Sequence, residues 1–91
     1  MSENSCVTSP HFVGLIYSLA NAAQISLGQV PNPVTGRRER DLGHAEETID
    51  LLDALREKTR GNLTREESSL LDSSITTLRL AFVSRAQGRE P

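Results

Sequence analysis

Three polar residues about one helical turn apart are the first candidates for chemistry in this sequence. His44, Glu47 and Asp50 recur at three-residue spacing, so on a helix they would project from successive turns. An imidazole with carboxylates is a ligand set that divalent metals accept. No second His and no Cys accompanies these residues at ligand spacing. A solvated acidic helix face therefore accounts for them, and we expect neither a metal nor another cofactor.

Three arginines near the middle of the chain are a second candidate. Arg37, Arg38 and Arg40 surround Glu39, and guanidinium groups could hold a phosphate or an acidic partner. A solvated loop is the alternative interpretation. No Gly-rich phosphate loop follows a strand, and no Ser or Cys lies in a nucleophile motif. We therefore expect that the protein is not an enzyme.

Composition narrows the class of protein and its partners. Ten Lys and Arg against twelve Asp and Glu leave a formal charge of -2, and aromatic residues make up 3% of the chain. A basic field and stacking platforms for nucleic acid are thus both missing, so we expect no nucleic-acid partner. The single Cys6 lies in a polar N-terminal segment without a signal-peptide pattern, which predicts a cytoplasmic protein.

The segment from residue 10 to residue 27 is the element around which we expect the chain to fold. It has apolar residues at helical spacing and no Lys, Arg, Asp or Glu. Ser9 is a suitable N-cap, Pro10 suits the first turn, and Gly28 can end the helix in the left-handed conformation. This pattern predicts a helix that is packed on more than one side.

The apolar character of this segment covers about half of the helix circumference, more than one helical hairpin can cover. We therefore expect a homo-oligomer, with Leu15 and Leu19 as candidate contacts to another subunit or to an unidentified protein partner. The segment approaches the length of about 20 residues that spans a membrane. Ser18, Asn21 and Gln24 interrupt it, so we expect no membrane span.

The connection over residues 28–40 is the leading candidate for a binding site. Its thirteen residues exceed the usual two to eight between helices, and Pro31 and Pro33 favour an ordered, extended backbone. Alternatively, Val30 and Val34 merely pack into the core, and on either view Val34→Ser is expected to lower stability. With the two helical positions above, the candidate interaction surface comprises Leu15, Leu19, Pro31, Pro33, Arg37, Arg38 and Arg40.

Two amphipathic helices are predicted after this connection. The first begins near Asp41 and runs to about Lys58, and the second follows the N-cap Thr64. Thr64 with Glu67 forms a capping box, in which we expect Thr64 to contribute more than Glu67. The predicted inner faces are Leu42, Ala45, Ile49, Leu52 and Leu55 on the first and Leu71, Ile75, Leu78 and Phe82 on the second.

These elements predict an all-α fold: a small three-helix domain in which the last two helices form an antiparallel hairpin packed on the neutral first helix. We expect one domain over residues 9–87, with disordered tails over residues 1–8 and 88–91.

The order of short motifs along the chain resembles a family of small bacterial proteins catalogued as a domain of unknown function, number eighteen forty-four. The resemblance spans most of the chain and implies a cytoplasmic helical protein with no assigned activity. The motifs that carry it are Leu27-Gly28, Pro31-Asn32-Pro33, Thr35-Gly36, Asp41-Leu42 with Ala45, Ile49-Asp50 with Leu52 and Leu55, Lys58 to Thr64 with Glu67, and Leu78-Arg79 with Phe82-Val83.

Three functions are compatible with these observations. The first is a non-enzymatic, homo-oligomeric protein-interaction module that uses the neutral helix. The second is a protein that binds a small ligand or phosphate through the loop from Pro31 to Arg40. The third is a peripheral membrane adaptor.

Overall fold

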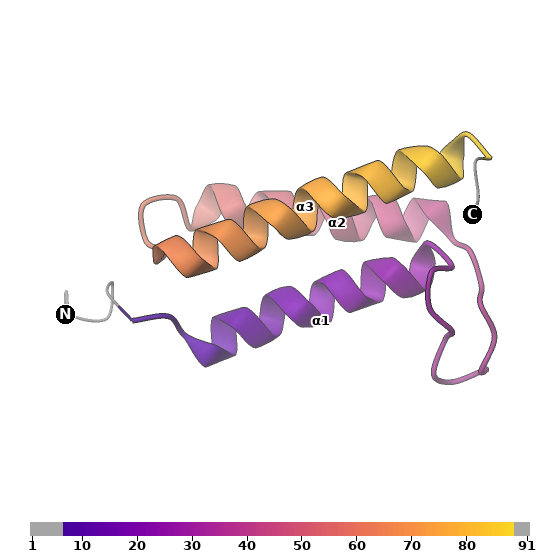
Figure 1. The fold of residues 1–91 in the computed structure, drawn as a ribbon, viewed down its shortest axis with the longest axis horizontal. Helices are drawn as coiled ribbons and strands as arrows, with labels where there is room; N and C mark the ends of the chain where they lie inside the picture. The colour runs from indigo at the N-terminus through magenta and orange to yellow at the C-terminus, as the bar shows by residue number, and fades with distance from the viewer. Residues whose placement is uncertain (1–6, 89–91) are drawn as a thin grey trace.

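The computed structural model describes residues 7–88, which form three helices (Figure 1). α1 spans Pro10–Ser26, α2 spans Leu42–Lys58 and α3 spans Arg65–Ala86, and residues 7–88 contain no strand. The prediction of an all-α, three-helix fold is confirmed. The predictions made for residues 1–6, including Cys6, and for residues 89–91 lie outside the described residues.

Each helix begins at a side chain that accepts a backbone N–H of the first turn. The Ser9 hydroxyl accepts the N–H of Phe12 at 3.2 Å, and the Asp41 carboxylate accepts the N–H of His44 at 3.1 Å. Because these caps satisfy amide groups that have no partner within the helix, they fix where each helix starts. The starts therefore fall at the positions that the sequence predicted.

The start of α3 carries the predicted capping box and an additional link to α1. The Glu67 carboxylate accepts the backbone N–H of Thr64 at 2.8 Å and that of Ser9 at 2.7 Å. The hydrogen bond from the Ser9 N–H, followed by that from the Thr64 N–H, lowers the pKa of the buried Glu67 carboxyl below its ordinary value. Thr8, predicted to belong to a disordered tail, shares a 2.8 Å hydrogen bond with the Thr64 hydroxyl. One carboxylate thus joins the N-termini of two helices.

The ion pairs between α2 and α3 show that these helices run in opposite directions. Arg56 lies 3.1 Å from Asp72, whereas Arg79, farther along α3, lies 3.5 Å from Asp50, which comes earlier in α2. Asp53 contacts both arginines. By contrast, α1 and α3 start side by side and run parallel (Figure 1).

The core lies along the line where the three helices meet. Half-buried Phe12, Leu19 and Phe82 pack against it, and Gly28 ends α1 with a φ of 80°, as predicted. The buried apolar residues are Ile16, Ala23, Leu27, Ala45, Ile49, Leu52, Leu71, Ile75 and Leu78.

Candidate functional site

The loop between α1 and α2 projects from one end of the bundle (Figure 1). Its predicted site residues are all exposed: Pro31, Pro33, Arg37, Arg38 and Arg40. The Arg37 side chain lies 3.8 Å from Glu39, at the long limit of a surface ion pair. An exposed pair of this kind contributes little to stability. The arginines therefore lie on a surface, and Figure 1 shows no helix packed over this loop.

The tip of this loop is a hydrogen-bonded turn built around Asn32. The Asn32 N–H donates to the carbonyl of Arg37, its carbonyl accepts the N–H of Gly36, and its side-chain oxygen accepts the N–H of Val34 at 2.8 Å. This turn directs Val34 away from the bundle and leaves it 90% exposed, whereas Val30 is half-buried. The alternative that Val34 packs into the core was therefore wrong. That the loop is rigid in solution stays a prediction.

The base of the loop is closed by contacts between the end of α1 and the start of α2. The Ser26 carbonyl accepts the N–H of Asp41 at 2.7 Å, and the Ser26 hydroxyl lies 2.7 Å from Nδ1 of His44. A Cβ on Gly28 would lie 3.4 Å from the carbonyl oxygen of Glu39, so the two ends of the loop approach closely at a glycine. The Ser26–His44 contact was not predictable from the sequence, because neither residue lies in a recognisable motif.

A hydroxyl beside an imidazole is one requirement for a catalytic nucleophile. A third group must also orient the imidazole, and the Asp41 carboxylate instead accepts the backbone N–H of His44. Ser26 is buried at the C-terminal end of α1, where the helix dipole disfavours a developing oxyanion. The Ser26–His44 contact joins the end of α1 to the start of α2 at the base of the loop.

The space beneath the loop has the wrong charge for phosphate. A cavity of about 320 Å³ is lined by the acidic residues Glu39 and Asp41, by Asn32 and His44, and by apolar residues that include Ile25. Carboxylates repel an anion, and the three arginines are not part of this lining. Among residues 7–88, no group of three or more His, Cys, Asp or Glu side chains is placed to hold a metal ion.

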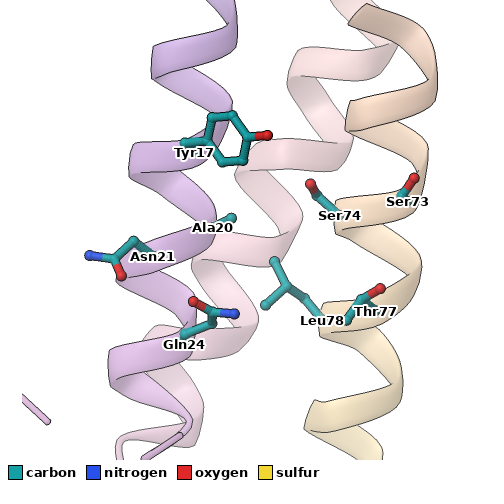
Figure 2. A pocket seen from close by; sticks show the side chains of 8 residues that line it. All are labelled: Tyr17, Ala20, Asn21, Gln24, Ser73, Ser74, Thr77 and Leu78. Carbon is teal, nitrogen blue, oxygen red and sulfur yellow. The ribbon is translucent and has the colours of Figure 1, made fainter. Parts of the chain in front are cut away.

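A groove of about 500 Å³ separates α1 from α3 on the side away from α2 (Figure 2). Tyr17 from α1 and Leu78 from α3 point into the gap from opposite sides (Figure 2), and the buried Leu78 lies at its floor. None of its lining residues carries a formal charge: Tyr17, Ala20, Asn21, Gln24, Ser73, Ser74, Thr77 and Leu78. This arrangement places hydroxyl and amide groups around an apolar floor. Such a site suits a neutral surface rather than an ion.

The predicted interaction residues of α1 do not line this groove. Leu19 packs against the core, and Leu15 is 44% exposed. Two residues along a helix turn by about 200°, so Leu15 and the groove residue Tyr17 lie on opposite flanks of α1. The loop residues lie at the end of the bundle (Figure 1), so the predicted surface is divided among separate places. The sequence shows that Tyr17, Asn21 and Gln24 are neutral, but their position beside α3 follows only from the packing of the helices.

The fold defines a three-helix protein with an uncharged groove and, within residues 7–88, no helix long and apolar enough to cross a membrane. A family model described as "Domain of unknown function (DUF1844)" matches residues 9–84. The chain belongs to this family, as its motifs indicated. No curated protein and no solved structure matches the chain.

Proposed function

We propose that this protein is a non-catalytic interaction module that self-associates through the uncharged face made by α1 and α3. The observation that carries the proposal is the groove between these helices, whose walls contain no charged side chain. The charged side chains elsewhere keep most of the surface hydrated, whereas this face loses little hydration when it is covered.

The distribution of charge supports this face over the other sides of the bundle. α1 contains no Lys, Arg, Asp or Glu, although charged residues make up 24% of the chain. The outer side of α2 is acidic and would repel a copy of itself; its exposed carboxylates include Glu46, Glu47, Asp50 and Glu57.

A solution mass tests the proposal, with two variants matched on the same helix. By light scattering, we expect the wild type to exceed the 10.0 kDa of one chain. Tyr17→Glu puts a charge into the groove and should give a folded monomer. Leu15→Glu puts the same charge on the opposite flank of α1 and should leave the mass unchanged. Circular dichroism checks that both variants keep their helices.

Two results would contradict the proposal. The first is a wild-type protein that stays monomeric at tens of micromolar. The second is loss of association in Leu15→Glu but not in Tyr17→Glu, which would place the contact on the other flank of α1.

A further inference from the structure

We infer that the groove between α1 and α3 receives α3 of a second copy, which runs antiparallel to the first α3 across a twofold axis near Thr77. This inference rests on the proposed function and names the partner and its orientation. The contacting edge of α3 is the α3 ridge, defined as Ser73, Thr77 and Leu80. These residues are exposed and lie on one side of the helix, at spacings of four and three.

Charge selects the α3 ridge as the occupant of the groove. Because the groove offers no ion to pair with, a charged side chain buried there would lose its hydration without compensation. Between Ser73 and Ser84 the only charged residue of α3 is Arg79. Asp50 and Asp53 hold Arg79 on the side of α2, away from the groove. The ridge can therefore enter the groove without burying a charge.

The size of the side chains also favours this contact. Ser73, Ser74 and Thr77 are small, so a second helix can approach the α3 side of the groove closely, while Tyr17 lines the α1 side. Leu80, which is 68% exposed in the single chain, would become buried against the groove of the second copy. Ser and Thr hydroxyls both donate and accept hydrogen bonds, so identical residues can pair with each other across a twofold axis.

The direction of the second helix follows from symmetry and from the fold. A twofold axis perpendicular to α3 makes the two copies of α3 antiparallel. Since α1 runs parallel to α3, the incoming helix is antiparallel to both walls of the groove, as α2 is on the other side. This places opposed helix dipoles side by side and gives the packing of an antiparallel helical bundle.

The surface that α1 and α3 present is large enough for the interface of a small dimer. The 17 residues of α1 extend about 25 Å, and two adjacent helices are about 20 Å wide. This footprint gives about 500 Å² for each copy, or about 1,000 Å² in total, the lower end for a specific interface. The contact would thus be small and dependent on concentration.

Disulfide trapping tests the arrangement in the full chain with Cys6 replaced by Ser. On mild oxidation, we expect Thr77→Cys to form a covalent dimer of twice the chain mass, because the two copies of this residue meet at the axis. Leu15→Cys, on the opposite flank of α1, should stay monomeric on a non-reducing gel. Ala54→Cys, exposed on α2, is a second control.

A second pair of positions fixes the direction without depending on Thr77. A mixture of Ser73→Cys and Leu80→Cys chains should give the mixed disulfide in preference to either homodimer. In the antiparallel arrangement with the twofold axis at Thr77, the two copies of Ser73 lie about 12 Å apart along the helix direction, which exceeds the reach of a disulfide. In a parallel pair, each residue would instead meet its own copy.

The outcomes separate this inference from the function on which it rests. A wild-type dimer by mass that crosslinks at Leu15→Cys or Ala54→Cys, or at Ser73→Cys with itself, overturns the arrangement but leaves self-association standing. A wild-type monomer by mass overturns both. Trapping at Thr77→Cys together with the mixed disulfide supports the twofold antiparallel pair.

Discussion

Glu67 has a larger role than a capping box alone would give it. From the sequence, Glu67 is expected to contribute less to the capping box than Thr64. In the structure, however, its buried carboxylate accepts backbone N–H groups at the N-termini of two helices, α1 and α3. Removing it leaves the amides of Ser9 and Thr64 without their acceptor, and charge-assisted hydrogen bonds are worth more than neutral ones. We therefore expect Glu67→Ala to cost about 2 to 3 kcal/mol of unfolding free energy.

Thr64→Ala is the matched comparison at the same cap and should cost about 1 kcal/mol. Urea unfolding measures both variants, with the slope of the transition used to check that each still unfolds in one step. A larger loss for Thr64→Ala than for Glu67→Ala would mean that the Ser9 contact adds nothing.

The same carboxylate predicts how stability depends on pH. Its pKa in the folded protein is lowered, first by the Ser9 N–H and then by the Thr64 N–H. The unfolded chain therefore binds the proton more tightly than the folded chain does. The stabilisation is complete above about pH 4.5, the ordinary value, and is lost as the pH falls through the lower pKa of the folded state.

Glu67→Gln isolates this effect, because glutamine keeps the shape of the side chain but offers only one acceptor oxygen. The wild type should be more stable than Glu67→Gln at neutral pH, and the difference should narrow below about pH 4.5. Thermal melts of both proteins across this range measure it. A difference that is constant with pH would show that the charge of Glu67 is not involved.

Of the contacts that Glu67 makes, the one with Thr64 was predictable from the sequence and the one with Ser9 was not. Thr64 and Glu67 are three positions apart, so the capping box follows from local spacing. Ser9 is 58 positions from Glu67, and Ser26 is 18 positions from His44. These pairs form only because helix packing brings distant segments together. No periodic pattern encodes that packing.

At the scale of elements, the helices were predictable because each start depends on a local cap and each core face on helical spacing. Ala45, Ile49 and Ile75 were each assigned to an inner face and are buried. The groove was not predictable, since it depends on which flank of α1 faces α3.

The loop between α1 and α2 gives a prediction that reverses the expectation from the sequence. Val34 is 90% exposed, so Val34→Ser removes no buried surface and should change the unfolding free energy by less than about 0.5 kcal/mol. Val30→Ser, at a half-buried position in the same loop, should cost about 1 kcal/mol. Urea unfolding of both variants makes the comparison. Equal losses would indicate that the tip packs against the bundle in solution.

At the scale of the whole molecule, the charges are arranged unevenly. The loop carries arginines, the outer side of α2 carries carboxylates, and the ion pairs of α3 face α2. The uncharged polar and apolar residues that line the groove lie on α1 and on the edge of α3 that faces α1. The net charge of -2 is small, so repulsion between whole molecules does little to oppose association.

This arrangement predicts that thermal stability depends on protein concentration. Among residues 7–88, nine buried apolar residues form the core that the three helices share, and two of them are alanines. If dimers form only from folded chains, a tenfold rise in concentration adds about 1.4 kcal/mol per dimer, which corresponds to a rise of about 2 to 5 °C in the melting temperature. Calorimetry over a wide concentration range measures this shift in the melting temperature.

Tyr17→Glu is the control variant. It should melt at a lower temperature that does not change with concentration, because it cannot bind a second copy. A wild-type melting temperature independent of concentration would mean that the uncharged face is not covered by another chain.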